Sequence, residues 1–338
     1  MHIKENHSLK KYNTFGVDAR ARYFAEIQND DQFIELIESD CYNRFPKLIL
    51  NGGSNILFTQ DFEGIVYKVN TNGIDVIEDS NNHVVVRARA GVCWDDLVKF
   101  SIENAWAGLE NLSMIPGNVG AAPIQNIGAY GVEQKDCFCE LEALEIATCK
   151  KVDFTKHACC FGYRDSIFKR ELKGKYIILS VTYKLSKVPE FNIKYGSIGQ
   201  ELKNMEVSHV TVETIGEAVR RIRASKLPSP EDTGNAGSFF KNPVVDKSKY
   251  YKLLNDHPDV AAYPVDKTHY KIAAGWLIDS LGWKGKRRGD AGVWHSQALV
   301  LVNYGNATGH QILELAEDIK ESVMEAYDLE LESEVNII

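Results

Sequence analysis

Residues 108–131, GLENLSMIPGNVGAAPIQNIGAYG, follow neither the two-residue period of a strand nor the period of about 3.6 residues of a helix. The stretch is rich in glycine, proline, asparagine and alanine, and it has no run of charges, so it does not resemble a disordered linker. A long, uncharged, aperiodic segment inside a compact domain is usually a binding loop. The rest of the chain must therefore supply regular elements that hold this loop.

Regular periods flank the loop on both sides and predict an α+β fold rich in strands. We predict strands within residues 45–58, 64–69, 83–91, 140–148, 175–185 and 329–338. We predict helices at 29–39 with Asn29 as N-cap, at 94–105, at 211–226 with Thr211 as N-cap, at 269–282 ending at Gly282, and at 307–327. Helices are concentrated between about residues 212 and 327.

Composition excludes several classes of function. A net charge of −8 argues against a general nucleic-acid or anionic-membrane surface. We expect no membrane span, because no apolar run approaches the ~20 residues that a spanning helix needs, and the polar N-terminus shows no secretory signal. The seven cysteines lack metal-ligand spacing, so we expect reduced thiols in a cytoplasmic protein and no metal site.

The sequence LILNGGSN is a candidate anion site, because consecutive backbone N–H groups at Gly52 and Gly53 can turn toward a phosphate. Ser54 and Asn55 add short polar side chains. A simple tight turn between two strands is the other interpretation. A Rossmann fold is disfavoured because a strand, not a helix, follows the glycines and G-x-G-x-x-G is absent. Residues 52–55 and 115–131 together could wrap one extended diphosphate ligand.

The segment AGSFFKNPVV, residues 236–245, contains the hydroxyl of Ser238. This hydroxyl is either a structural group in a turn or a group that moves a proton. No histidine or acid lies nearby in the sequence to activate a nucleophile, so the local sequence leaves both readings open.

Segments along nearly the whole chain resemble the UDP-N-acetylenolpyruvoylglucosamine reductases, flavoenzymes of peptidoglycan precursor synthesis. In order, they are NTFGVDA, LNGGSNILF, residues 108–131, CFGYRDSIFK, GNAGSFFKNP, AAGWLIDSLG, QALVLVN and LESEVNII. The stretch VPEFNIKYGSIGQEL resembles the extra substrate-covering loop of the family's first type. The resemblance implies a vanillyl-alcohol-oxidase-type FAD-binding unit in two parts, residues 1–70 and residues 71–211 with 328–338. It also implies a third, α+β domain for the UDP-sugar at 212–327.

The resemblance also implies an activity, which is the reduction of an enolpyruvyl ether on a UDP-sugar by NADPH through FAD. Ser238 matches the proton donor, and Arg164 and Glu334 match residues that stabilise an enolate. The implied FAD contacts are Gly52, Gly53, Ser54, Asn55, Ile115, Pro116, Gly117, Gly120, Ala121, Gln125, Asn126, Gly128 and Ala129. The implied substrate contacts are Tyr130, Tyr195, Lys226, Asn242 and Gln297.

Some of these residues also have structural interpretations. Glu334 could be a solvated acid, Lys226 part of a solvated helix face, and the basic turn KGKRRG a surface loop. Ala122, Ser333 and Asn118 occupy positions where the family's residue often differs. A related FAD oxidase of a sugar or alcohol, and a UDP-sugar-binding protein without redox function, are the alternatives. We expect a cytoplasmic monomer that serves cell-wall synthesis, cell shape and cell division.

Overall fold

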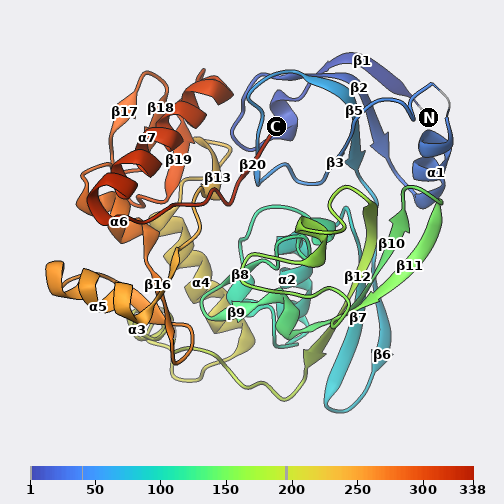
Figure 1. The fold of residues 1–338 in the computed structure, drawn as a ribbon. Coiled ribbons are helices and arrows are strands. Elements are labelled where there is room, and N and C mark those ends of the chain that lie inside the picture. Colours follow the sequence, from blue (N-terminus) through green and yellow to red (C-terminus); the bar gives the residue numbers. More distant parts are fainter. Residues whose placement is uncertain (1, 40, 195–196) are drawn as a thin grey trace. The chain divides into compact units, whose positions relative to one another are not determined.

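The computed structural model describes residues 2–39, 41–194 and 197–338, and its elements are drawn in Figure 1. The chain divides into two compact units. The first unit comprises Met1–His7, Ala21–Gly53 and Glu63–Ala224, and the second comprises Ser8–Arg20, Ser54–Phe62 and Ser225–Ile338. The division into three domains stays a prediction alongside these two units.

A four-stranded sheet in the order β1-β2-β5-β3 forms the N-terminal part of the first unit. Its strands are β1 (Ile3–Ser8), β2 (Arg20–Ile27), β3 (Lys47–Leu50) and β5 (Phe62–Val69), and β3 runs parallel to β5. Helix α1 (Asp30–Glu38) begins as predicted, because the side chain of Asn29 accepts a hydrogen bond from the Gln32 amide at 3.1 Å. Phe33 of α1 is buried in the same core cluster as Tyr67 of β5.

A five-stranded antiparallel sheet in the order β11-β10-β12-β7-β6 forms the other large layer of the first unit (Figure 1). The strands are β6 (Ile74–Asp79), β7 (His83–Arg89), β10 (Phe138–Glu145), β11 (Lys150–Thr155) and β12 (Tyr176–Ser186). Helix α2 (Trp94–Glu103) packs on this sheet. Its buried Trp94 meets Tyr183 edge-on, with ring centroids 5.8 Å apart.

Two further helices and a short hairpin complete the first unit. The hairpin consists of β8 (Gly128–Ala129) and β9 (Val132–Glu133); it begins within the long aperiodic segment and ends just after it. Helices α3 (Ile198–Asn204) and α4 (Val212–Lys226) bury a common apolar cluster that includes Leu202, Ile215 and Val219. The hydroxyl of Thr211 accepts from the Thr214 amide, so the predicted N-cap of α4 is present.

The second unit is built on a sheet in the order β13-β19-β18-β17. Its strands are β13 (Gly234–Ser238), β17 (Arg287–Arg288), β18 (Ala291–Val293) and β19 (Val300–Asn303). Helices α6 (Ala274–Ser280) and α7 (Gly309–Tyr327) pack in the same unit. Thr308 and Gln311 form a capping box at the start of α7.

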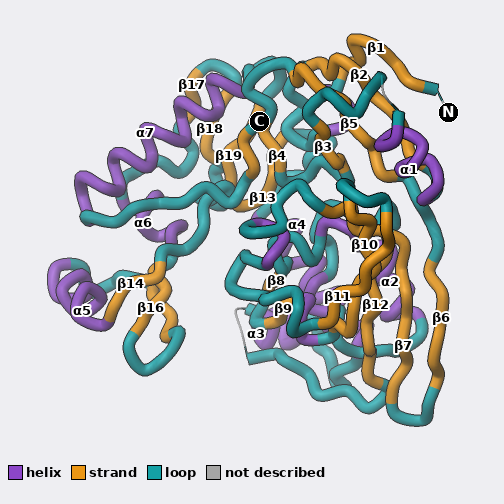
Figure 2. The backbone as a smooth tube through the Cα atoms, turned by 45° about the vertical axis from the view of Figure 1, so that its right-hand side comes forward, coloured by secondary structure: helices purple, strands orange, loops and turns teal. Residues whose placement is uncertain are grey.

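Two small sheets lie at other places in the second unit. In Figures 1 and 2, helix α5 (Lys247–Asp256) lies against the sheet β14-β16-β15, whose strands are Val244–Asp246, His269–Ile272 and Ala262–Pro264. Strand β20 (Asn336–Ile337) runs parallel to β4 (Ile56–Leu57).

The structure corrects two predicted elements. Residues 269–272, predicted as the first turn of a helix, form the middle strand β16, because they pair with β14 on one side and β15 on the other. The predicted strand at 329–338 is regular only at Asn336–Ile337. The segment changes partners, from Phe240 at Ser333 to β4 at Asn336, so neither pairing grows long.

Candidate functional site

The two glycine-rich segments of the first unit touch each other. A Cβ atom added to Gly52 would lie 2.7 Å from the Cα of Gly117 and 2.9 Å from Oδ1 of Asn118. Real Cβ atoms do not approach other heavy atoms so closely, so any side chain at residue 52 would push the segments apart. Asn118 in turn donates from Nδ2 to the Gly91 carbonyl at 2.5 Å. Residues 52–53 and 115–131 therefore share one surface, as a ligand wrapped by both would require.

Asn51, immediately before the glycine pair, carries an orphaned acceptor. Its Oδ1 atom is buried, and among the residues that the structure describes it has no hydrogen-bond partner. A buried acceptor without a partner is unfavourable by about 1–3 kcal/mol. A ligand hydroxyl or amine would satisfy it, and FAD carries both, so this cradle fits the cofactor. Sequence reasoning missed Asn51, because only the folded chain shows that its acceptor is buried and unpaired among the described residues.

The backbone fixes the 115–131 segment against residues 90–94. The amide of Trp94 donates to Gly117, and the amides of Val119 and Gly120 donate to Val92 and Ala90, each at 2.9 Å. This segment carries most of the predicted cofactor contacts, namely Ile115, Pro116, Gly117, Gly120, Ala121, Gln125, Asn126, Gly128 and Ala129.

Asn126 differs from the other predicted contacts in this segment. It is fully buried, and its Nδ2 atom donates to Glu133 at 3.0 Å and to the Gly162 carbonyl at 2.9 Å. Its Oδ1 atom accepts from the Lys135 amide. The side chain is thus committed to the protein, and only its backbone is available to a cofactor.

Arg164 lies beside the end of the same segment. Its backbone adopts the left-handed conformation with φ of 53°, and its Nη2 atom donates to the Gly128 carbonyl at 2.5 Å. Its guanidinium carbon lies 5.4 Å from the centre of the Tyr163 ring. The structure therefore brings the predicted carboxylate-binding arginine to Gly128, a predicted cofactor contact.

Tyr130, a predicted substrate contact, is half-buried and packs on the cluster formed by α3 and α4. Burial raises the pKa of its phenol, and the charge of Arg223 opposes that shift. Burial also lowers the pKa of Arg223. The Nε atom of Arg223 is buried and makes no hydrogen bond within the described part of the chain. A cation beside Tyr130 with an unused donor is suited to an anionic ligand.

The structure separates Arg223 from its neighbours in the run VRRIRASKLP. Arg220 forms a two-bond ion pair with Asp95, at 2.7 and 2.9 Å, and Arg221 pairs with Glu217 on the surface. Lys226, the predicted substrate contact, is exposed at the end of α4 and belongs to the second unit. The sequence alone could not show which of these cations are paired with acids and which have an unused donor.

Ser238 in the second unit follows a bulge in strand β13. The register with β19 shifts between Asn235 and Ser238, and Gly237 at this shift has φ of +68°. The Gly237 amide donates to Oδ1 of Asn235 at 3.0 Å, which fixes the irregular backbone. A bulge bends a strand and re-aims the following side chain, and such bulges are common beside active sites. The bulge therefore sets the direction of the side chain of Ser238, a half-exposed residue.

Glu334 lies next to the strand that carries Ser238. The Glu334 amide donates to the Phe239 carbonyl at 2.8 Å, and the Lys241 amide donates to the Glu332 carbonyl at 2.9 Å. Asn55 also reaches this segment, because its Nδ2 atom donates to the Glu334 carbonyl at 3.2 Å. Three residues predicted from distant motifs, Asn55, Ser238 and Glu334, therefore gather in the second unit.

The predicted substrate contacts Asn242 and Gln297 each lie near the start of helix α6. Oδ1 of Asn242 accepts from the Ala274 amide at 2.9 Å, and its Nδ2 atom makes no hydrogen bond among the residues that the structure describes. Oε1 of Gln297 would lie 3.2 Å from a Cβ atom added to Gly275. The remaining predicted contact, Tyr195, lies outside the described residues.

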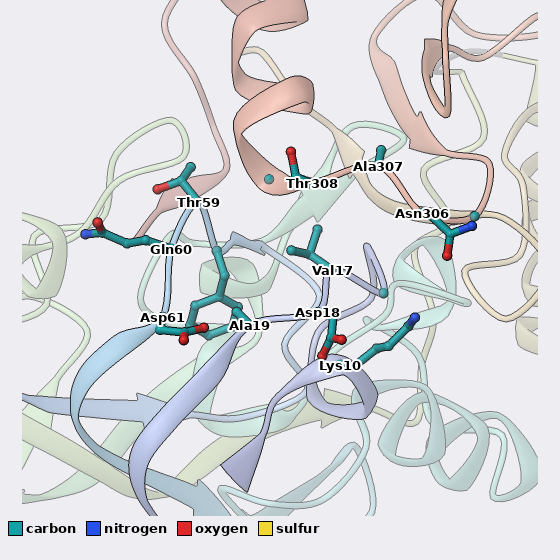
Figure 3. A pocket seen from close by; sticks show the side chains of 14 residues that line it. Lys10, Val17, Asp18, Ala19, Thr59, Gln60, Asp61, Asn306, Ala307 and Thr308 are labelled. Carbon is teal, nitrogen blue, oxygen red and sulfur yellow. The ribbon is translucent and has the colours of Figure 1, made fainter. Parts of the chain in front are cut away.

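A cavity of about 380 Å³ lies elsewhere in the second unit. Figure 3 shows the first turn of α7 with Thr308 on one side and Val17, Asp18 and Ala19 on the other. Lys10, Gly16 and residues 58–61 and 305–309 complete the lining, which contains none of the predicted site residues. The two carboxylates of Asp18 and Asp61 outnumber the single cation, Lys10, so the cavity is a poor site for a diphosphate.

Comparison with known proteins identifies the class first. Residues 21–153 match the family described as FAD binding domain. The crystal structure of UDP-N-acetylenolpyruvylglucosamine reductase from Thermus caldophilus superposes with a TM-score of 0.70 at 23% identity, over 99% of this chain and 98% of that chain. The predicted fold class is thereby confirmed: an α+β chain with an FAD-binding unit of the vanillyl-alcohol-oxidase type, not a Rossmann fold. These matches place the chain in the class of proteins with an FAD-binding domain of this fold.

The family follows from the second unit and from relatives over the full length. Residues 229–338 match the family described as UDP-N-acetylenolpyruvoylglucosamine reductase, C-terminal domain. Proteins named UDP-N-acetylenolpyruvoylglucosamine reductase from Amoebophilus asiaticus and Flavobacterium johnsoniae are 47% and 45% identical, each over 100% of both chains. The chain belongs to this family, whose members are flavoenzymes of peptidoglycan synthesis that use FAD and NADPH.

Two further observations concern membranes and metals. None of the helices within the described ranges has the length and apolar character needed to cross a membrane. Across the same ranges, no three His, Cys, Asp or Glu side chains are grouped so that they could hold a metal ion. All seven cysteines are free thiols.

Proposed function

We propose that this protein reduces UDP-N-acetylglucosamine enolpyruvate to UDP-N-acetylmuramate with electrons from NADPH. The observation that carries the proposal is the hydrogen bond from the Glu334 amide to the Phe239 carbonyl, which holds Glu334 beside the strand of Ser238. Two residues from motifs far apart in the sequence, one with a hydroxyl and one with a carboxyl, thus lie on adjacent backbone segments. Overall, the substrate gains a hydride at C3 and a proton at C2, and NADPH becomes NADP⁺.

FAD, when bound, accepts a hydride from NADPH and supplies one to C3 of the enolpyruvyl group. Ser238 gives its proton to C2. A serine hydroxyl is a weak acid, so it is useful only next to a strongly basic carbon centre, which hydride addition beside a carboxylate creates. This also explains why no histidine needs to accompany Ser238, as it would for a serine nucleophile.

Arg164 and Glu334 stabilise the negative charge that develops on the substrate. The guanidinium of Arg164 can bind the substrate carboxylate through two parallel N–H bonds, and its bond to the Gly128 carbonyl orients it. Glu334 would contribute as a hydrogen-bond donor, a role that only its protonated carboxyl group can fill. Stabilisation of this kind acts where charge appears in the transition state.

The binding residues divide between cofactor and substrate. The glycine-rich segments at 52–55 and 115–129 hold FAD, with Asn51 satisfied by a cofactor hydroxyl or amine. Tyr130, Tyr195, Lys226, Asn242 and Gln297 contact the UDP-sugar, and the free Nδ2 donors of Asn242 suit a phosphate oxygen. The chain comprises three domains, with the first unit containing most of the FAD-binding pair. It is a monomer of the cytoplasm, where free thiols are typical.

The test is an anaerobic visible spectrum of the purified protein, recorded before and after NADPH and again after UDP-N-acetylglucosamine enolpyruvate. We expect flavin bands that bleach with NADPH and return with the substrate. If the bands bleach and never return, the assignment as a flavoprotein would stand and the assignment of the substrate would be refuted. A colourless protein that takes up no added FAD would refute the whole proposal.

The role of Ser238 has its own test. In Ser238→Ala, bleaching by NADPH should proceed at the wild-type rate, because no proton at C2 is involved in that half-reaction. Return of the flavin bands with substrate should slow by about 10²- to 10⁴-fold, the usual contribution of a positioned acid. Equal rates of return in the variant and the wild type would remove Ser238 from the mechanism.

A further inference from the structure

The turn of the β8–β9 hairpin has an unusual backbone. Gly128 pairs with Glu133 and Ala129 with Val132, so the two central residues of the turn are Tyr130 and Gly131. Both have positive φ, 50° and 78°, which defines a type I′ turn. Glycine adopts this conformation readily, whereas tyrosine seldom does, because its Cβ atom crowds the following carbonyl. The surroundings must therefore hold Tyr130 in place.

Two asparagine side chains hold this turn. Asn111, almost fully buried, donates from Nδ2 to the Tyr130 carbonyl at 3.1 Å and to the Asn192 carbonyl at 2.9 Å. Asn192 donates from its own Nδ2 to the Gly131 carbonyl at 3.0 Å. Each carbonyl of the turn's central residues thus receives one amide, and the two asparagines are bonded to each other. We call Asn111 and Asn192 the turn staple.

The turn determines the position of two groups of the candidate site. At one end of the hairpin, the Gly128 carbonyl accepts the bond from Arg164. At its tip, the left-handed backbone sends the Tyr130 side chain against the α3–α4 cluster, where the charge of Arg223 acts on its phenol. If the turn relaxed to φ below zero at Tyr130, the phenol would leave this place and the Gly128 carbonyl would shift.

We propose that the turn staple is a pair of positioning residues that hold Tyr130 and Arg164 in the geometry that binds the UDP-sugar. The inference rests on the proposed function, because it concerns how the proposed substrate is bound. It assigns no chemical step to the two asparagines. The staple also joins the turn to residues 188–194, the start of the stretch that resembles the family's extra loop. A site that binds an extended substrate gains rate when its contacts are held in advance.

The test uses Asn192→Asp in the FAD-loaded enzyme. Asn192 is exposed, so the change should leave folding intact, but a carboxylate cannot donate to the Gly131 carbonyl and repels it. The matched control is Asn104→Asp, because Asn104 is exposed in the same unit and donates from Nδ2 to the Phe100 carbonyl at 2.8 Å, away from the turn. Asn111→Asp tests the buried member.

We expect Asn192→Asp to keep wild-type FAD content and bleaching by NADPH. Its affinity for UDP-N-acetylglucosamine enolpyruvate, titrated through the flavin spectrum of the oxidised enzyme, should fall about 10- to 100-fold, the usual effect of losing a supporting contact. Asn104→Asp should match the wild type. In a double-mutant cycle with Arg164→Lys, the two losses should be less than additive, because both act on the same contact.

Each outcome separates this inference from the function on which it rests. A wild type that turns over substrate, with Asn192→Asp equal to it in affinity, overturns the turn staple alone. Strictly additive losses in the cycle also overturn it, since they would assign Asn192 an effect independent of Arg164. A wild type that neither binds nor reduces the substrate overturns the proposed function and this inference together.

Discussion

Replacing Gly237 by alanine tests whether the bulge in β13 aims Ser238. Gly237 has φ of +68°, and a Cβ atom added there would meet no heavy atom within 4 Å. The substitution therefore introduces no clash, and its whole effect comes from backbone strain. The left-handed conformation of a non-glycine residue is unfavourable by about 1–2 kcal/mol. The chain can either bear this strain or relieve it by moving the bulge, which turns Ser238 away.

Gly282 provides the matched control. It lies in the same unit, has φ of +70°, and also has open space where a Cβ atom would stand. Gly282→Ala should therefore lose the same ~1–2 kcal/mol of unfolding free energy. Gly282 ends helix α6 and lies outside the candidate site, so activity should not change.

The assay combines urea unfolding with the two anaerobic half-reactions. We expect both glycine variants to be destabilised alike and both to bleach normally with NADPH. Only Gly237→Ala should slow the return of the flavin bands with substrate, by about 10- to 100-fold, as displacement of a reacting group by about 1 Å does. Full activity in a destabilised Gly237→Ala would refute the idea that the bulge aims Ser238. An equal loss in Gly282→Ala would show that the effect is not local.

Three further changes test other parts of the site. Arg164→Lys should slow flavin reoxidation by substrate at least tenfold in stopped-flow traces, because a point charge cannot bridge both carboxylate oxygens. Gly52→Ala should lose FAD on gel filtration and destabilise the protein by about 1–3 kcal/mol, because its Cβ atom would meet the backbone of Gly117. Burial acts to raise the pKa of Asp95, but hydrogen bonds led by that from Arg220 outweigh it and hold the pKa below its ordinary 3.8. The stabilisation by ionised Asp95 is therefore complete above pH 3.8 and is lost as the pH falls through the lowered pKa. In urea unfolding at pH 7, Asp95→Asn should have a lower free energy of unfolding than the wild type. The difference in unfolding free energy between the two proteins should become smaller below pH 3.8.

Sequence patterns predicted the long regular elements well. Helices α1 and α4 begin at the caps expected from Asn29 and Thr211, because capping chemistry is local. The run at 269–282 failed because His269–Ile272 receives its pairing from strands on both sides, β14 and β15. Pairing between distant strands is tertiary information that no local period carries.

The sequence indicated some residues of the candidate site and could not indicate others. Consecutive glycines indicated a close approach at Gly52, and the structure supplies its partner, Gly117, from another segment. Asn51 and Arg223 were not singled out, because their meaning lies in unused polar atoms that only the folded chain reveals. The bulge before Ser238 was also invisible, since its register shift is defined against β19.

The left-handed residues explain why the long segment had no period. Met114, Asn126 and Tyr130 lie within residues 108–131 with φ of 62°, 46° and 50°, and Arg164, which bonds to this segment, has φ of 53°. Each such residue is unfavourable by roughly 1–2 kcal/mol, so a sequence selected for stability alone would place glycine there. In the proposed function, the phenol of Tyr130 and the guanidinium of Arg164 bind the substrate, which explains why glycine does not occupy these positions. The backbone strain then lies in the residues that we propose to bind the ligand, and functional residues are where local sequence rules are expected to fail.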